Sequence, residues 1–337
     1  MSILKGNIMK QYTVRIPATS ANIGPGFDCL GIAFKLYNWF TFTWENPEQP
    51  VSYEEQVKWL ATRTASQMPM LEAYAQYCRL FNVELPIPTK VECIRSDVPV
   101  AKGLGSSATC YVAGARAAQW IAEYLYSTDQ IESDYNTHNV NPFTKDAILA
   151  IASTIEQHPD NLSPAVFGGL QLAAILDSDN LPQVVTQELS VSSDVNFIIN
   201  IPSFSLQTAK ARGILPAEVS RADAIFNIRA LGYLLKGMSD ANHDLLSLGL
   251  QDKLHQPYRA GLIPNFYEIL NVGIQSGACG SVLSGAGPSI LTVTCNSQAN
   301  AQEIKNKIQT CLGNAWEVKI LGLDHEGVVG REGKATF

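Results

Sequence analysis

The sequence predicts a two-domain protein in which β-sheets and α-helices are layered together, of the α/β or the α+β class. The chain has 337 residues, and a single domain usually holds about 100–200. Hydrophobic residues make up 46% of the chain and charged residues 16%, which is enough to build a sizeable core. Strand-like and helix-like segments alternate in both halves, and this alternation predicts sheets covered by helices.

The first half of the chain contains four expected strands and three expected helices. The strands are rich in β-branched, aromatic and other apolar residues, at 12–17, 32–44, 89–94 and 168–176. The helices carry apolar residues at helical spacing, at 70–81, 106–126 and 144–155. Glycine-rich or polar stretches between them predict loops at 18–31, 127–142 and 177–180.

The second half opens with a buried strand at 195–201. Further helices are expected at 222–236, 241–248, 265–275 and 298–311, with a strand–loop–strand unit at 278–295 and a closing strand at 317–321. We place the boundary between the halves near 180–194, which predicts domains at 10–187 and 188–337.

Composition and charge exclude several classes of partner. The formal net charge is −7, from 31 acidic and 24 basic residues. Nucleic acids and anionic membranes both require a basic surface, so we expect neither as a partner. No apolar run approaches the roughly 20 residues of a membrane span, and the first residues lack a secretory apolar core. The seven cysteines are scattered without a C-x-x-C pair, which predicts reduced thiols in a cytoplasmic protein rather than a zinc site or a disulfide framework.

The most informative stretch is Pro99-Val100-Ala101-Lys102-Gly103-Leu104-Gly105-Ser106-Ser107-Ala108. Its two glycines let the backbone curl, so that successive N–H groups point into one concavity. The helix expected from Ser106 aims its free N–H groups and its positive dipole end at the same point. The serine hydroxyls suit phosphate oxygens or Mg²⁺. A capped helix after a glycine turn is the plainer alternative, and the Gly-Lys-Ser/Thr ending of a Walker A loop is absent.

This run resembles the central motif of the GHMP kinases, a superfamily of ATP-dependent small-molecule kinases. Two further stretches resemble its other motifs: P-A-T-S-A-N-I-G-P-G-F-D-C-L-G at 17–31 and S-G-A-G-P-S at 284–289. Within the superfamily, the first of these is most similar to the homoserine kinases. The resemblance implies an α+β, two-domain GHMP kinase fold, with an N-terminal ribosomal-protein-S5-domain-2-like domain and a C-terminal ferredoxin-like domain. It also implies a homodimer.

The resemblance implies that ATP binds between the two domains, with residues 284–288 closing over the phosphates. The implied ATP-binding residues are Pro99, Lys102, Gly103, Leu104, Gly105, Ser106, Ser107, Ala108, Ser284 and Gly285.

A second cluster, Glu156-Gln157-His158-Pro159-Asp160-Asn161, lies between two expected helices and resembles the homoserine kinase segment E-x-H-x-D-N. The resemblance makes Glu156 and Ser107 the Mg²⁺ ligands and places Asp160 at the accepting hydroxyl, with Asn161 near the transferred phosphate. A single carboxylate suits Mg²⁺, which keeps most of its waters. Taken alone, Asp160 would equally serve as an N-cap and Glu156 as a solvated residue. We interpret His158 as structural.

The acceptor is expected to be held by groups from three further segments. Asn22 and Asp28 offer an amide and a carboxylate from one loop, although such residues also simply build turns. Thr208 and Arg212 share one helical face, in an element similar to S-T-x-x-A-R-x-x-L-P, and Arg259 matches P-Y-R-x-x-L-x-P. Guanidinium groups grip carboxylates with two hydrogen bonds, although surface ion pairs are the commoner fate of arginines.

The resemblance thus implies two overlapping groups of residues. The substrate-binding group is Asn22, Asp28, Asp160, Thr208, Arg212, Arg259 and Gly285, and the catalytic group is Asp160, Asn161, Glu156 and Arg259.

Three positions depart from the homoserine kinase pattern. Gln67-Met68-Pro69-Met70 replaces an Asn-Leu/Ile-Val/Ile element that is thought to touch adenine. Lys102 stands where the family often has Gly or Ser, and Leu206-Gln207 replaces an apolar-Ser pair. None of these changes removes a charged catalytic group.

The reaction implied is transfer of the γ-phosphoryl group of MgATP to the side-chain hydroxyl of L-homoserine, giving O-phospho-L-homoserine for threonine biosynthesis. Asp160 would act as a base or as a hydrogen-bond anchor, and we expect an anchor because phosphoryl transfer relies on alignment and charge neutralisation. One alternative is another GHMP kinase of the mevalonate type, whose acceptor has no ammonium. The other is a non-catalytic, ligand-sensing homologue, which the intact Glu156, Ser106, Ser107 and Asp160 oppose.

Overall fold

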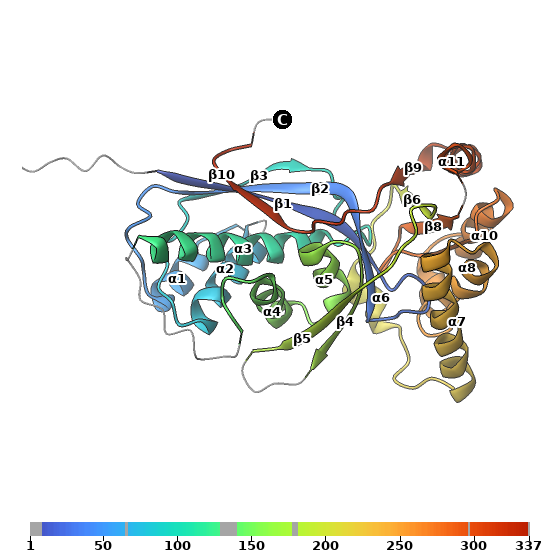
Figure 1. Cartoon of the computed structure of the whole chain (residues 1–337), viewed down its shortest axis with the longest axis horizontal. Helices are drawn as coiled ribbons and strands as arrows, with labels where there is room; N and C mark the ends of the chain where they lie inside the picture. Colours follow the sequence, from blue (N-terminus) through green and yellow to red (C-terminus); the bar gives the residue numbers. More distant parts are fainter. Residues whose placement is uncertain (1–8, 65–66, 129–139, 177–180, 296, 336–337) are drawn as a thin grey trace, which may run out of the picture.

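The structure is a computed structural model, and it describes residues 9–64, 67–128, 140–176, 181–295 and 297–335. Within them, two β-sheets lie side by side along the long axis of the molecule, each with its own set of helices (Figure 1). The first sheet has the strand order β10-β1-β2-β4-β5, with β3 also paired to β2, and the second has the order β7-β8-β6-β9. No helix in these ranges is long and apolar enough to cross a membrane.

The first sheet is antiparallel and is built on one long hairpin. Its strands are β1 (Lys10–Ala21), β2 (Leu30–Trp44), β3 (Lys90–Ser96), β4 (Leu170–Leu176), β5 (Gln183–Leu189) and β10 (Val329–Glu332). In the hairpin Lys10 lies opposite Trp44 and Ala21 opposite Gly31. β10 comes from the far end of the chain and pairs with β1, as Figure 1 shows.

The hairpin corrects the prediction of a loop over 18–31. β1 continues to Ala21 and β2 begins at Leu30, so the turn is shorter than expected. The small and polar residues at 18–21 have low strand propensity, yet they are buried and pair with residues 31–34. Buried backbone N–H and C=O groups must find partners, and here the neighbouring strand supplies them.

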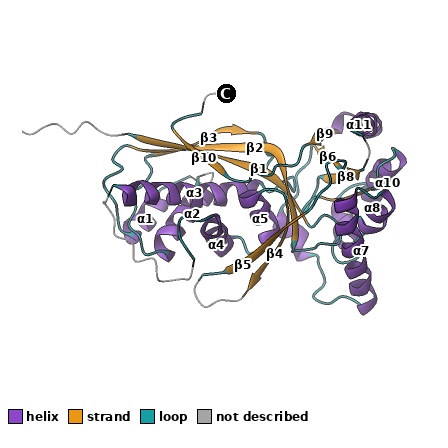
Figure 2. Ribbon diagram, viewed as in Figure 1, coloured by secondary structure: helices purple, strands orange, loops and turns teal. Residues whose placement is uncertain are grey.

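Five helices cover one face of the first sheet (Figure 2). They are α1 (Tyr53–Leu60), α2 (Met68–Leu80), α3 (Ser106–Ser127), α4 (Lys145–Ile155) and α5 (Pro159–Phe167). α3 is the central helix and contacts α2, α4, α5 and β1. Ala115 and Ala117 of α3 are fully buried, and their small side chains let the neighbouring helices approach closely.

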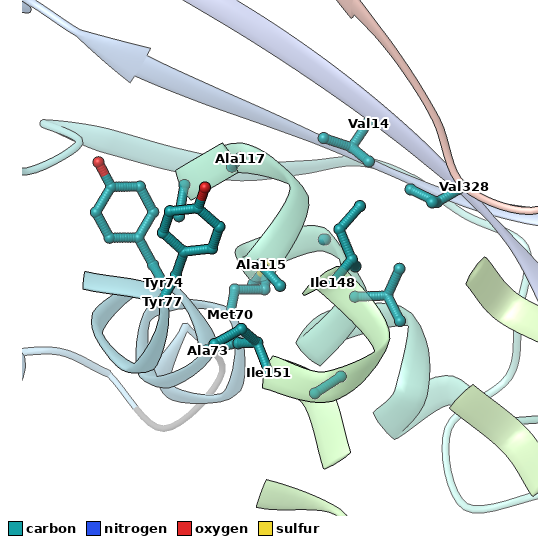
Figure 3. Packing of buried hydrophobic residues seen from close by; sticks show 14 of the residues in the cluster. Val14, Met70, Ala73, Tyr74, Tyr77, Ala115, Ala117, Ile148, Ile151 and Val328 are labelled. Atoms are coloured by element: carbon teal, nitrogen blue, oxygen red, sulfur yellow. The ribbon is translucent and has the colours of Figure 1, made fainter. Parts of the chain in front are cut away.

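The core between these helices and the sheet is drawn in Figure 3. Met70 of α2 lies next to Ala115 of α3, and Ile148 of α4 lies beneath Val14 of β1, while Tyr74 and Tyr77 of α2 fill the other side of the same cluster. Ser106 at the start of α3 and Asp160 near the start of α5 line one cavity together with residues of the later half of the chain.

The second sheet is also antiparallel. Its strands are β6 (Asn196–Pro202), β7 (Gly280–Leu283), β8 (Ile290–Thr294) and β9 (Trp316–Leu321). The helices of this half are α6 (Thr208–Gly213), α7 (Arg221–Asp240), α8 (His243–Gly249), α9 (Gln256–Arg259), α10 (Phe266–Gln275) and α11 (Gln298–Leu312). Short 3₁₀ turns follow α9 and α11, at Ala260–Leu262 and Gly313–Ala315.

The segments expected from the sequence are present with shifted ends, and four elements were missed, one of which is the four-residue helix α9. α1 was missed although Ser52 and Glu55 form a capping box at its start. β5 and β10 are short strands with little apolar alternation, and they form through pairing with β4 and β1. Residues 129–139 of one predicted loop, and all of the loop predicted at 177–180, lie outside the described residues.

The division into domains at 10–187 and 188–337 stays a prediction. Along the chain, β5 belongs to the first sheet, and the next strand, β6, is the first strand of the second sheet. β10 is the one described strand of the later half that pairs into the first sheet, against β1.

Candidate active site

A cavity of about 520 Å³ lies where loops of both halves meet. Fifteen of the residues predicted for the site line it: Asn22, Asp28, Lys102, Gly103, Leu104, Gly105, Ser106, Ser107, Glu156, Asp160, Asn161, Thr208, Arg212, Arg259 and Gly285. Three others, Pro99, Ala108 and Ser284, are not part of its wall, and the last two are fully buried behind it. The fold therefore gathers residues that are up to 263 positions apart in sequence, as in the Asn22–Gly285 contact.

The phosphate-loop geometry requires its two glycines. Gly103 and Gly105 have φ of +75° and +69°, a left-handed backbone that disfavours any side chain. A Cβ on Gly105 would lie 2.0 Å from Thr19 Oγ1, and one on Gly103 would lie 2.2 Å from Ser284 O. α3 starts at Ser106, so its first N–H groups face the cavity without partners inside the helix. This geometry fits the predicted amide cradle, whose binding of phosphate stays a prediction.

Neighbouring segments brace this loop from both sides. Thr19 N donates to Leu104 O at 3.2 Å, and the Thr19 hydroxyl donates to Asn161 Oδ1 at 2.9 Å. The Ser284 hydroxyl lies 2.6 Å from Gly103 O. Sequence analysis did not single out Thr19, although its place inside the first glycine-rich motif was a signal.

Two carboxyl groups at the junction of α4 and α5 are unusual for their burial. Asp160 is 2% exposed, and its Oδ1 has no hydrogen-bond partner within the described chain. Burial raises the pKa of Asp160 to about 7, with the nearby charges of Asp28 and Glu156 adding to the effect. Glu156 Oε2 is likewise buried without a described partner, and burial raises the pKa of Glu156 to about 7. Carboxylate oxygens left in this way suit a cation or a hydroxyl donor.

The opposite wall carries an ion pair. Arg212 donates from Nη1 and Nη2 to the two carboxylate oxygens of Asp28, at 3.0 and 2.7 Å. Arg212 stands on α6 with Thr208 at its start, which confirms that these two residues share a short helix. Both partners of the pair are about one third exposed, at 36% for Arg212 and 34% for Asp28.

Asn22 is mainly engaged in building the turn that holds Asp28. Its Oδ1 accepts from Asp28 N and its Nδ2 donates to Gly285 O, both at 3.0 Å. Asn22 and Asp28 also have positive φ, of 69° and 58°. These contacts are those expected of residues that build a turn. The Nδ2 amine of Asn22 has a second N–H, which the bond to Gly285 O does not use.

Arg259 is held by neutral partners. It is 2% exposed, and it donates to Ala211 O at 3.1 Å and to Gly285 O at 3.2 Å. Its third partner is His255 Nδ1, at 3.1 Å. The Nη2 amine has no hydrogen bond among the described residues, and the side chain lines the cavity. This buried cation can therefore receive an anion.

Sequence analysis missed His255 and Phe27. Arginine can only donate, so His255 Nδ1 accepts from Arg259 and Nε2 carries the proton that is donated to Gly24 O at 2.9 Å. Burial lowers the pKa of His255, which favours this neutral form. Phe27 stacks on His255, with ring centroids 5.2 Å apart, and lies beneath the guanidinium of Arg259. Both residues support Arg259 from behind.

Pro69 and Cys110 line another part of the cavity wall. Pro69 belongs to the segment that departs from the homoserine kinase pattern. Gln67 of the same segment donates to Val91 O at 3.4 Å, so its amide is engaged with β3. The adenine contacts expected in this region stay a prediction.

Comparisons with known proteins show which family this chain belongs to. The sequence models described as GHMP kinases N terminal domain and GHMP kinases C terminal match residues 69–169 and 229–314. These matches identify a GHMP-class, ATP-dependent kinase. The chain is 37% identical over 329 residues to the homoserine kinase of Nostoc punctiforme, covering 95% of this chain and 98% of that protein. It is 35% identical over 317 residues to the homoserine kinase of Clostridium botulinum strain Langeland, covering 94% and 97%. The chain belongs to the homoserine kinase family.

Solved structures show the same fold. The crystal structure of homoserine kinase from Cytophaga hutchinsonii aligns with a TM-score of 0.74 at 23% identity, covering 98% of this chain and 99% of that one. A crystal structure of mevalonate kinase aligns with a TM-score of 0.61 at 14% identity, covering 93% and 99%. The expected two-domain α+β GHMP kinase fold is confirmed.

Proposed function

We propose that this protein transfers the γ-phosphoryl group of MgATP to the side-chain hydroxyl of L-homoserine. The observation that carries the proposal is the Asp28–Arg212 ion pair, which faces the phosphate loop across one cavity. An α-amino acid presents an ammonium beside a carboxylate, and this pair presents a carboxylate beside a guanidinium. The two arrangements are complementary in charge.

The phosphate end of the cavity would be formed by backbone groups. We propose that the N–H groups of the loop and of the first turn of α3 converge on one phosphate position, where the helix dipole favours an anion. The dipole contributes only about 0.3–1 kcal/mol per charge, so the N–H groups would carry most of the phosphate binding. The hydroxyls of Ser106 and Ser107 line the same wall.

The residues present fit a Mg²⁺ ion. Glu156 Oε2 is a buried carboxylate oxygen without a described partner, and Ser107 lies on the same cavity wall. We propose these two residues as the ligands, with substrate oxygens and water completing the coordination. When bound, the ion would neutralise phosphate charge and keep Glu156 ionised at pH values where burial alone would protonate it.

The acceptor would be held by the opposite wall. Asp28 would bind the ammonium, and Arg212 together with the available Nη2 of Arg259 would bind the carboxylate. Asp160 Oδ1 is the group left to accept a hydrogen bond from the side-chain hydroxyl. Asn161 is held by Thr19 close to the phosphate loop, which would place it near the transferred group.

Asp160 is proposed as an anchor for the hydroxyl rather than as a strong base. Correct positioning of two reactants can supply about 7–11 kcal/mol, whereas a general base typically contributes about 10²–10⁴-fold in rate.

The role of Asp160, the cytoplasmic location and the homodimer stay predictions. The seven cysteines are free, which is compatible with a reducing compartment.

The test is ADP release from MgATP with L-homoserine, L-threonine, L-serine, mevalonate and galactose, alongside Glu156→Gln as the blank. We expect turnover with L-homoserine and its loss in Glu156→Gln. Turnover with another alcohol alone would refute the proposed acceptor and leave the kinase class intact. ATP binding without turnover on any alcohol would favour a ligand-sensing homologue.

A further inference from the structure

The ammonium of Lys102 is fully engaged by backbone carbonyls of the other half of the molecule. Nζ donates to Pro202 O at 2.9 Å, to Ser203 O at 2.8 Å and to Phe204 O at 2.5 Å. A lysine ammonium has three N–H donors, so in this arrangement none is left for a phosphate oxygen. Lys102 lies in the phosphate loop, yet its charge is directed away from the phosphate position.

The segment that receives these bonds is attached to the phosphate loop in a second way. Leu206 N donates to Ala101 O at 3.1 Å, and Ser203 N donates to Ala315 O at 2.9 Å. Residues 202–206 are therefore held between the phosphate loop and the 3₁₀ turn that follows α11. Lys102 O in turn accepts from Ser289 N at 3.2 Å, which ties the same residue to the third motif.

This segment leads directly into the acceptor side of the site. It ends two residues before α6, which starts at Thr208 and carries Arg212. Ala211 O, also on α6, accepts from Arg259 Nε at 3.1 Å. The position of the 202–206 segment thus sets where both cavity arginines stand.

We propose that Lys102 is a positioning residue that holds the acceptor half of the site in place from the phosphate loop, and is not a phosphate ligand. The proposal rests on the proposed function for the identity of the acceptor. Charge-assisted hydrogen bonds are stronger than neutral ones, and three of them converge on one stretch of backbone. Binding of a nucleotide at the phosphate loop and binding of an acceptor beside α6 would share this tether and therefore influence each other.

The kinetic test compares Lys102→Met, Lys102→Arg and the control Lys307→Met, which removes an exposed lysine paired with Glu303 on α11. In Lys102→Met we expect the KM of the acceptor to rise about tenfold or more, with the KM of ATP changed less than about threefold. Lys102→Arg should keep the KM of the acceptor close to that of the unaltered protein, because a guanidinium also donates to several carbonyls. Lys307→Met should behave as the unaltered protein.

Two kinetic outcomes would overturn the proposal. A raised KM for ATP with an unaltered acceptor KM would make Lys102 a phosphate ligand. Unaltered values for both substrates would show that the tether has no role in the site.

A second measurement does not depend on which alcohol is the substrate. Hydrogen exchange of the unliganded protein reports on the amides of residues 203–208, including Leu206. We expect faster exchange there in Lys102→Met than in Lys307→Met, and an equal rate would contradict the tether. Faster exchange without any turnover on L-homoserine would reject the proposed substrate and keep the tether. If Lys102→Met does not fold, Lys102→Gln, which keeps two N–H donors, takes its place in both measurements.

Discussion

Arg212 and Asp28 form a two-bond ion pair across 184 residues of sequence, joining α6 to the turn between β1 and β2. The pair closes one side of the cavity, at a point reached by solvent. Exposed ion pairs contribute little to stability, so a pair of such regular geometry at the cavity is better explained by ligand binding. Each of its charges would be available to the opposite charge of a zwitterion.

The two members of this pair should act as one unit in catalysis. Asp28→Asn and Arg212→Met should each lower kcat/KM for the acceptor about 30- to 100-fold, through KM, because each removes one charge of the acceptor site. The double variant should be little worse than the worse single variant. Steady-state kinetics of the three variants test this, and strictly multiplicative losses would show that the two residues act independently.

Glu156 should determine the response to Mg²⁺. Its buried Oε2 would lose its charge in Glu156→Gln, so the turnover that is lost at the Mg²⁺ concentration of the standard assay should return in part only at about tenfold more Mg²⁺ or above. Initial rates over a Mg²⁺ titration at fixed ATP measure the shift. Glu303→Gln, on the exposed face of α11, is the matched control, and equal titration curves for the two variants would exclude Glu156 as a ligand.

Asp160 should make the stability of the unliganded protein depend on pH. Burial raises the pKa of Asp160 from 3.8 to about 7, so between these values the folded chain holds a proton that the unfolded chain has released. The contribution of Asp160 to stability therefore decreases as pH rises through this window. Asp160→Asn lacks the effect, and relative to the unaltered protein it should gain about 3 kcal/mol between about pH 4.5 and pH 8.

Urea denaturation at both pH values measures this gain. Asp244→Asn is the control, because the Asp244 side chain is 96% exposed. If Asp160→Asn followed the unaltered protein at both values, Asp160 would not be buried as a protonated acid. A turnover that collapses at low pH only when Asp160 is present would instead identify this residue as a base.

His255 should affect the acceptor side of the site without touching the acceptor. Its removal takes one of two hydrogen bonds from Arg259 Nη1, which keeps its bond to Gly285 O, and it leaves Gly24 O without the bond from His255 Nε2 at a fully buried position. His255→Ala should lower the free energy of unfolding by about 2–3 kcal/mol and raise the acceptor KM more than the ATP KM. Denaturation and kinetics test this, with His255→Gln expected to be milder. Equal rises in both KM values would point to general loosening of the fold.

Gly105 should be essential for nucleotide binding. An alanine there would combine a positive φ with a Cβ 2.0 Å from Thr19 Oγ1. We expect Gly105→Ala to lower stability by about 1–3 kcal/mol and to weaken ATP binding, measured by titration calorimetry. Gly232→Ala on α7 is the control, because nothing lies within 4 Å of its added Cβ, and it should raise stability by up to about 1 kcal/mol. Similar behaviour of the two variants would contradict the close packing at Thr19.

The sequence by itself determined those parts of the protein that depend on neighbouring residues. The phosphate loop is one of them, because Gly103, Gly105 and the start of α3 lie within a few residues of each other and impose their own backbone geometry. The α3 helix is another, since its apolar spacing spans its whole length and Gly114 is the one helix breaker within it. The three glycine-rich motifs and the family resemblance follow from local sequence in the same way.

Only the tertiary structure decided which distant groups meet. Arg212 and Arg259 each lie in a segment that resembles the family, and the sequence predicts the same role for both. In the structure, Arg212 pairs with Asp28, whereas Arg259 is buried among carbonyl groups and His255. Lys102 lies in a phosphate motif but donates to carbonyls of residues 202–204. These partners are chosen by how the two sheets and their loops pack, and no local pattern of residues encodes a contact made across a hundred or more positions.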